Sequence, residues 1–124
     1  MTLLLDTHIL LWWLADDRRL SVDVRGLITT APIVVVSAAS AWEIAIKRAL
    51  GKLRAPADLA GVVARCGFSP LPITLQHAEA AGALPRHHHD PFDRMLIAQA
   101  EVEGLVIVTL DDRFRDYGVA TIGI

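Results

Sequence analysis

The strongest constraint on the fold is an alternation of short apolar runs with helix-length segments. Leu3–Leu5, Ile33–Val36 and Leu105–Leu110 are apolar and mostly branched, which is typical of buried strands. Segments long enough for helices separate them, so consecutive strands are joined by crossover connections. Strands that alternate with helices predict an α/β fold, with a mostly parallel central sheet of about five short strands flanked by helices.

Several helices have visible start signals. Thr7 and Ser21 are each placed to cap a helix, and Ser40-Ala41-Trp42-Glu43 has the form of a capping box. Asp90-Pro91 is typical of a helix start, with the aspartate as cap and the proline in the first turn. The predicted helices cover His8–Ala15, 22–29, 40–50, Ala57–Arg65, Thr74–Ala83, 91–103 and a turn over Arg113–Asp116, and two further short strands are expected over Phe68–Ile73 and Val119–Ile122.

Size and composition limit the class of protein. A chain of 124 residues predicts a single domain over 1–124, and a hydrophobic content of 53% suggests that some apolar surface lies in a subunit or partner interface. No apolar run approaches the roughly 18 residues needed to span a bilayer, which predicts no membrane partner. The single Cys66 and the absence of a basic, apolar leader predict a cytoplasmic protein.

Four acidic residues stand beside the predicted strand ends. Asp6 and Asp111 directly follow apolar runs, whereas Glu43 and Asp93 are expected in the first turns of helices. Each has a simpler explanation alone, because acids near helix N-termini are favoured by the helix dipole, and Glu43 would complete the box begun by Ser40. In a parallel sheet, however, all four would meet beyond the carboxyl ends of the strands.

Such a meeting of carboxylates predicts a metal site. Like charges at one edge raise each other's pKa and repel, and a divalent cation would relieve this repulsion. Oxygen ligands with no cysteine among them favour Mg²⁺ or Mn²⁺. The pattern therefore indicates metal-assisted chemistry on a phosphodiester, without choosing between RNA and DNA.

Four segments carry a resemblance to a known family. The segments 4–8 (LLDTH), 37–47 (SAASAWEIAIK), 90–100 (DPFDRMLIAQA) and 108–111 (VTLD) resemble the motifs of PIN-domain ribonucleases, and more narrowly of VapC-type toxins of type II toxin–antitoxin systems. The resemblance covers nearly the whole chain in the family's order. It implies a PIN-like three-layer domain, Mg²⁺- or Mn²⁺-dependent hydrolysis of RNA, a homodimer and a cognate VapB-type antitoxin as partner.

The resemblance also assigns roles to the four acids. Asp6 and Asp93 match the principal metal ligands, and Glu43 matches the acid that binds metal directly or through water and orients the attacking water. Asp111 would complete the cluster, with the adjacent Asp112 as its alternative.

Five further residues are expected to support the site. The hydroxyls of Thr7 and Thr109 are placed to position water or ligands, although both residues also suit a helix cap and a strand end. Lys47 either pairs with the acid one helical turn earlier or lies near the scissile phosphate. Arg94 is expected to contact phosphate or an acid, and Asp90 either caps a helix or joins the outer shell of the site.

The run His87-His88-His89 is expected to form a solvated loop, because neighbouring side chains in regular structure cannot all face one metal. Two other functions fit the same acids. A structure-specific DNA nuclease of the PIN superfamily would favour larger helical insertions or basic arms, which the chain lacks. A nuclease-inactive PIN binding module is disfavoured because all four acids are present.

Overall fold

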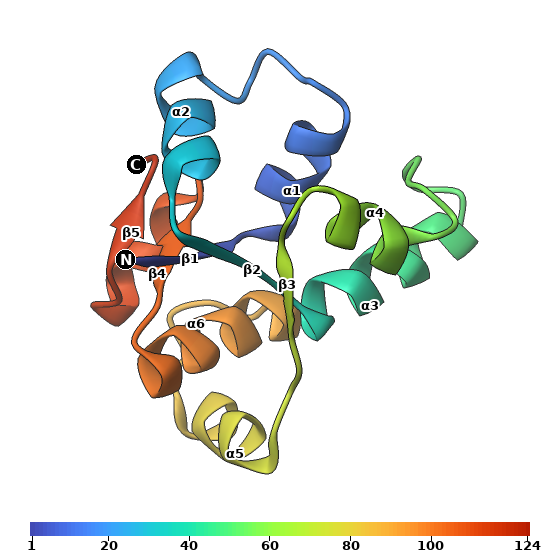
Figure 1. Cartoon of the computed structure of the whole chain (residues 1–124). Helices are drawn as coiled ribbons and strands as arrows, with labels where there is room; N and C mark the ends of the chain where they lie inside the picture. Colours follow the sequence, from blue (N-terminus) through green and yellow to red (C-terminus); the bar gives the residue numbers. More distant parts are fainter.

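The computed structural model describes residues 1–124 and contains one five-stranded sheet (Figure 1). All neighbouring strands are parallel, in the order β3-β2-β1-β4-β5, and β1 in the centre aligns Leu4 with Val35 of β2 and with Ile107 of β4. The strands are β1 (Thr2–Leu5), β2 (Ile33–Ser37), β3 (Ser69–Leu71), β4 (Val106–Val108) and β5 (Thr121–Ile122).

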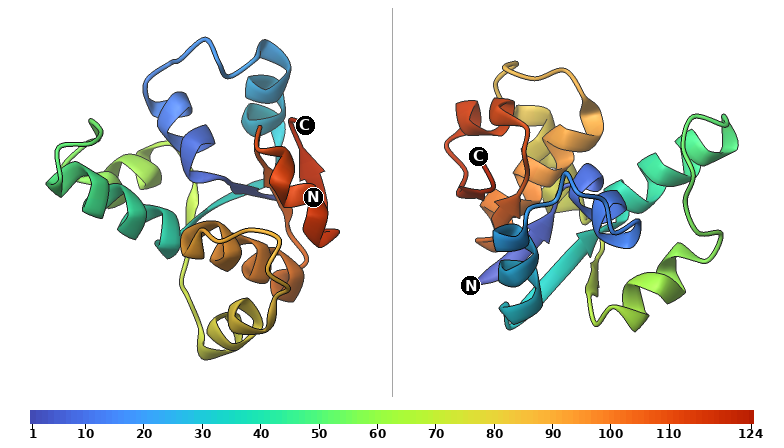
Figure 2. Two further views of the ribbon diagram at one scale, coloured as in Figure 1. Left: turned by 180° about the vertical axis from the view of Figure 1, so that it is seen from behind. Right: turned by 90° about the horizontal axis from the view of Figure 1, so that it is seen from above.

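Helices cover both faces of this sheet. α1 and α2 lie on one face and α5 and α6 on the other, while α3 and α4 extend beyond the side of β3 (Figures 1 and 2). The predicted three-layer α/β fold with a parallel sheet is therefore confirmed. The helices are α1 (Thr7–Leu14), α2 (Val22–Thr30), α3 (Ala38–Ala49), α4 (Leu59–Arg65), α5 (Leu75–Ala83), α6 (Pro91–Glu103) and the 3₁₀ helix η1 (Asp112–Tyr117).

Two apolar cores form because successive strand side chains point to opposite faces. Leu3 and Leu5 of β1 pack with Leu10 of α1 and with residues of α2 on one face. Leu4, between them, packs with Leu96 and other residues of α6 on the opposite face. Both faces of the sheet are thus buried, which explains the continuous apolar runs in the sequence.

Most predicted helix boundaries are confirmed. Ser21 and Thr74 cap α2 and α5 through their side chains, and Asp90 caps α6 with Pro91 in its first turn. Gly104 ends α6 in the left-handed conformation, with φ of 68°. None of the helices combines the length and apolar character needed to cross a bilayer.

Two predicted caps are wrong. Thr7 is the first helical residue of α1 rather than its cap, and Asp6 occupies the cap position without a side-chain capping bond. The cap of α3 lies three residues earlier than expected, at Ser37 rather than Ser40, because the Ser37 hydroxyl at the end of β2 accepts a hydrogen bond from the Ala39 N–H. Glu43 therefore lies beyond the first turn of α3, and the capping box does not account for it.

A buried hydrogen bond ties β2 to α6. Ser37 Oγ donates to Gln99 Oε1 over 2.6 Å, and both side chains are inaccessible to solvent. Gln99 Nε2 donates in turn to the Pro72 carbonyl beyond β3, over 3.3 Å. The link joins the strand that precedes Glu43 to the helix that carries Asp93.

We predict that Ser37→Ala lowers the free energy of unfolding by about 2–3 kcal/mol, because it removes the α3 cap and leaves Gln99 Oε1 buried without a donor. Ser21→Ala is the matched control, since it removes only a cap and should cost about 1 kcal/mol. Urea unfolding of both variants measures the difference. Equal costs would show that the buried Ser37–Gln99 bond contributes nothing.

Candidate metal centre

The predicted acids lie where the connections of the sheet reverse direction. β1 lies between β2 and β4. The connection from β1 to β2, through α1 and α2, crosses one face of the sheet, and the connection from β3 to β4, through α5 and α6, crosses the other (Figure 1). Asp6 directly follows β1, and its N–H still donates to the Val108 carbonyl of β4 over 3.0 Å. Such a switch point, at the carboxyl ends of parallel strands, is where α/β sheets bind ligands.

Asp6 is deeply buried at this switch point, with 4% of its surface exposed. Its Oδ2 accepts a hydrogen bond from Thr109 Oγ1 over 2.8 Å, and the same hydroxyl oxygen accepts from the Asp111 N–H over 3.0 Å. Burial raises the pKa of Asp6, although the bond from Thr109 opposes the rise. Thr109 thus fixes one acid and the backbone of a second.

Glu43 is also buried, with 3% of its surface exposed, and its two carboxylate oxygens differ. Oε2 accepts from Lys47 Nζ over 2.8 Å, which raises the pKa of Lys47. Oε1 is the only buried side-chain oxygen or nitrogen of the chain without a hydrogen-bond partner. An unpartnered carboxylate oxygen is costly to bury, and a bound cation is one way to satisfy it.

Asp93 stands in the first turn of α6. Burial, and to a lesser extent the negative charges of Asp6, Asp90, Glu43 and Asp111 in decreasing order, together raise its pKa to about 8. These charges act on Asp93 only because the sheet gathers residues from four separate segments at one edge. The structure therefore brings together the four acids that the sequence singled out.

Asp111 is the member of the adjacent pair that belongs to this cluster. Its carboxylate caps η1 and pairs with Arg113, whose NH2 lies 2.7 Å from Oδ2. Hydrogen bonds from Arg113 lower the pKa of Asp111 despite partial burial. Asp112 is exposed at the first position of η1.

His88 departs from the predicted solvated loop. His87 and His89 are exposed as expected, but His88 is buried, with 5% of its surface exposed. Its Nε2 lies 2.7 Å from Asp93 Oδ2, and its backbone N–H donates to the Tyr117 hydroxyl over 2.8 Å. The predicted helix start at Asp90 could have indicated that a histidine lies near Asp93, because the segment just before a helix passes close to that helix's first turn.

The remaining predicted residues have structural partners. Thr7 Oγ1 donates to Ser40 Oγ over 2.9 Å, which joins α1 to α3. The Asp90 carboxylate accepts from the first backbone N–H groups of α6, so it acts as a cap at the border of the site. Arg94 forms no ion pair with an acid. Its guanidinium donates instead to backbone carbonyls at the end of α5, those of Ala81, Leu84 and Pro85.

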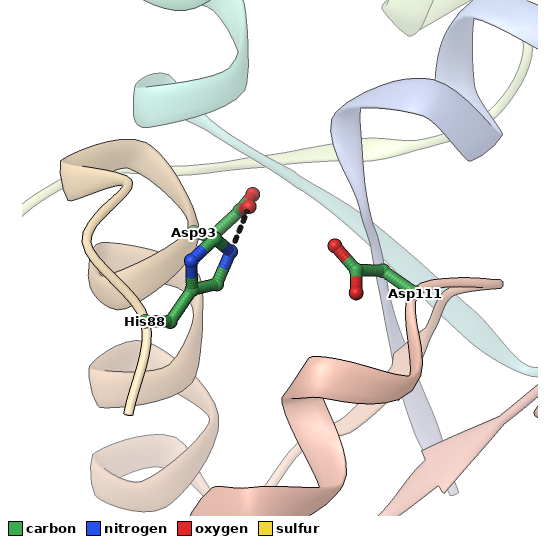
Figure 3. Close-up of side chains that lie close together, drawn as sticks. All are labelled: His88, Asp93 and Asp111. Atoms are coloured by element: carbon green, nitrogen blue, oxygen red, sulfur yellow. Dashed lines mark hydrogen bonds and ion pairs between the residues drawn. The ribbon is translucent and has the colours of Figure 1, made fainter. Parts of the chain in front are cut away.

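The residues present fit a divalent cation. His88, Asp93 and Asp111 each offer a ligand atom, and these atoms lie within 4.8 Å of one another (Figure 3). The close-up shows three side chains from separate segments turned toward a common space. Buried carboxylates with raised pKa values and one unpartnered oxygen supply the oxygen-rich surroundings that such cations prefer.

Comparison with known proteins gives consistent results. Residues 3–120 match the sequence model of the PIN domain family. Ribonuclease VapC22 of Mycobacterium tuberculosis is 35% identical to this chain, over 94% of this chain and 92% of that protein. A shorter match of 70 residues, 44% identical, joins 53% of this chain to 44% of Ribonuclease VapC16 of the same organism.

Solved structures share the fold at low sequence identity. VapBC2 from Rickettsia felis, crystallised with a DNA fragment from its promoter, superposes with a TM-score of 0.73 over 98% of both chains, at 13% identity. VapBC from Salmonella typhimurium, also bound to DNA, gives 0.68 over 98% of this chain and 97% of that one, at 19% identity. FitAcB from Neisseria gonorrhoeae gives 0.67 over 98% and 96%, at 18% identity.

The raised pKa of Asp93 predicts a pH-dependent stability in the presence of EDTA. A carboxyl group with a higher pKa in the folded chain favours folding below its unfolded pKa of 3.8, and this contribution is lost as the pH rises toward 8. From pH 5 to pH 8 we therefore expect the free energy of unfolding of Asp93→Asn to rise by roughly 3–4 kcal/mol relative to that of the native chain. Urea unfolding at both pH values, with exposed Asp112→Asn as control, would refute the assignment if the two variants behaved alike.

Proposed function

This chain belongs to the PIN domain family, and we propose that it is a Mg²⁺- or Mn²⁺-dependent endoribonuclease, the toxin of a toxin–antitoxin pair. The observation that carries the proposal is the convergence of Asp6, Glu43, Asp93 and Asp111 at one edge of the sheet, with Asp6 and Glu43 buried and the other two partly buried. The name of the relative that is 35% identical over nearly the full length supports RNA as the substrate.

In this proposal the acids hold the metal ion. Asp6 and Asp93 are the principal ligands, Glu43 contributes the oxygen that has no protein partner, and Asp111 completes the set. When bound, the ion would offset negative charge on the phosphoryl oxygens and lower the pKa of a water, which could then give up a proton and attack phosphorus.

Other side chains hold the acids in the positions proposed for metal binding. Thr109 holds the Asp6 carboxylate and the Asp111 backbone with one hydroxyl, which links the end of β1 to the segment after β4. Lys47 binds one oxygen of Glu43 and leaves the other free to bind the ion directly or through a water. Because these groups are fixed in advance, little reorganisation is needed when substrate binds.

The proposal extends to partners and location. Several solved structures with the same fold are VapBC or toxin–antitoxin complexes by name, which supports a cognate antitoxin as a partner of this chain. Large apolar side chains such as Trp42, Leu50 and Leu75 are well exposed, which supports burial in a homodimer or antitoxin interface. The free Cys66 is consistent with action in the cytosol.

We predict that Asp6→Asn and Asp93→Asn each reduce RNA cleavage at least 100-fold while the circular dichroism spectrum stays native, because each removes a metal ligand without adding bulk. Total RNA is incubated with the chain in Mg²⁺, Mn²⁺ or EDTA, and the cut ends are mapped. Cuts that need metal and leave 5′-phosphate and 3′-hydroxyl ends are expected.

Asp112→Asn is the matched control for this assay, since it removes an exposed acid one residue from Asp111 and should retain activity. Cleavage by Asp93→Asn at the native rate would contradict the site. Cuts that survive EDTA and leave cyclic phosphates would instead assign the chemistry to histidines. Selective cleavage of DNA would favour the DNA nuclease.

We further predict that saturating Mn²⁺ raises the thermal unfolding midpoint of the native chain by several degrees, because a ligand that binds only the folded state stabilises it. The shift should be absent in Asp6→Asn and present in Asp112→Asn. Differential scanning fluorimetry measures it. An unchanged midpoint in the native chain would argue against any carboxylate metal site.

A further inference from the structure

His88 is the one nitrogen-bearing side chain that the fold buries against the acids of the site. Its Nε2 lies 2.7 Å from Asp93 Oδ2, and its ring nitrogen is within 4.8 Å of an Asp111 oxygen (Figure 3). Asp111 approaches from the far side of the space that Asp93 and His88 share. None of the roles proposed above for the acids uses this imidazole.

The position of the imidazole is fixed by several contacts. The backbone N–H of His88 donates to the Tyr117 hydroxyl over 2.8 Å, and its carbonyl accepts from Arg94 over 3.4 Å. The ring meets Phe114 edge-on, with their centroids 6.3 Å apart. Two elements that follow it in the chain, α6 and η1, therefore hold the loop so that the ring faces the acids.

The spacing of these groups suits a common metal ion. Ligand atoms about 2.1 Å from an octahedral ion lie about 3 Å apart when adjacent and about 4.2 Å apart when opposite. The ligand atoms of His88, Asp93 and Asp111 are all within 4.8 Å of one another. Only small shifts would bring all three atoms to one ion.

We propose that His88 Nε2 is a ligand of the divalent metal ion, beside Asp93 and Asp111, and that this nitrogen makes the site prefer Mn²⁺ to Mg²⁺. The inference rests on the proposed function, since it assumes that the acids hold a cation. Imidazole suits transition metals, whereas Mg²⁺ favours oxygen ligands and retained water. Coordination replaces the bond to Asp93: Nε2 offers its lone pair and the ring proton moves to Nδ1. The long bond of 3.5 Å that Nδ1 accepts from the Asp90 N–H is then given up as well.

The competing explanation is that His88 only orients Asp93 through their hydrogen bond. Both roles predict weaker metal binding when His88 is replaced, so affinity alone does not separate them. A nitrogen bound to Mn²⁺ has a magnetic coupling to the unpaired electrons of the ion, whereas an imidazole bonded to a ligand carboxylate has almost none.

Electron spin-echo envelope modulation of the Mn²⁺-loaded full chain tests this difference. We expect a strong ¹⁴N coupling in the native chain and its loss in His88→Gln, which keeps a polar group of similar reach. A triple variant, His8→Gln with His87→Gln and His89→Gln, removes the three exposed histidines and should keep the coupling.

The triple variant also decides the question if His88→Gln does not fold. Only His77 and His88 then remain. The His77 ring is occupied elsewhere, because Nδ1 accepts from the Thr74 N–H and Nε2 lies 2.8 Å from Glu103. Coupling that persists in the triple variant therefore comes from His88, and coupling lost there overturns the proposal.

Binding titrations by isothermal calorimetry give the second readout. His88→Gln should weaken Mn²⁺ binding about tenfold or more and Mg²⁺ binding less than threefold, because only Mn²⁺ gains much from the nitrogen. His89→Gln, at an exposed neighbour, should change neither. Equal losses for both ions would overturn the proposed preference.

The outcomes separate the inference from the function on which it rests. A native chain that binds Mn²⁺ without ¹⁴N coupling overturns the role of His88 and leaves the carboxylate nuclease intact. A native chain that binds no Mn²⁺ overturns both. Mn²⁺ binding with a coupling that only His88→Gln abolishes supports both.

Discussion

The burial of several carboxylates at one edge of a parallel sheet is the constraint on which the rest of this structure depends. A parallel sheet directs the carboxyl ends of all its strands to the same edge. Here that edge receives Asp6 after β1 and Asp111 after β4, while α3 and α6 add Glu43 and Asp93. Burial at this edge removes water from Asp6 and Asp93, and this desolvation raises the pKa of both, with repulsion among the acids adding to it.

The protein offsets this repulsion only in part. Asp111 pairs with Arg113 and Glu43 with Lys47, so two of the four carboxylates have a cation beside them. Asp6 has the Thr109 hydroxyl, the Thr7 N–H and His8 nearby, and Asp93 has His88. Burial raises the pKa of Asp6 and Asp93, the two acids without a lysine or arginine. The negative charge that remains is what a divalent ion would neutralise.

Much of the fold was predictable because its signals are local. Asp90 with Pro91 specifies the start of α6 through cap chemistry, and Gly104 specifies its end through a left-handed backbone. The prediction that Ser40 caps α3 was wrong for an equally physical reason. The spacing of Ser40 to Glu43 suits a capping box, yet Ser37 stands at the strand end and caps α3 first. Both Ser37 and Ser40 are suited by residue type to cap a helix, and α3 starts after Ser37 because β2 ends there.

The candidate site was predictable to the extent that it follows from strand order. Acids that directly follow apolar runs, such as Asp6 and Asp111, meet in any parallel arrangement of those runs. His88 was missed because nothing in three consecutive histidines distinguishes the middle one. Its loop is bonded to Tyr117, which is twenty-nine residues away and reaches the loop because η1 packs against α6.

The sequence by itself determined the α/β class, the helix boundaries set by caps and glycines, and the identity of the four acids. These features depend on side-chain periodicity and on backbone chemistry within a few residues. Only the tertiary structure decided which oxygen of Glu43 lacks a partner, that Asp111 rather than Asp112 belongs to the cluster, and that His88 faces Asp93. Those outcomes depend on contacts between segments far apart in the chain, and such contacts exist only once the sheet and its helices have packed together.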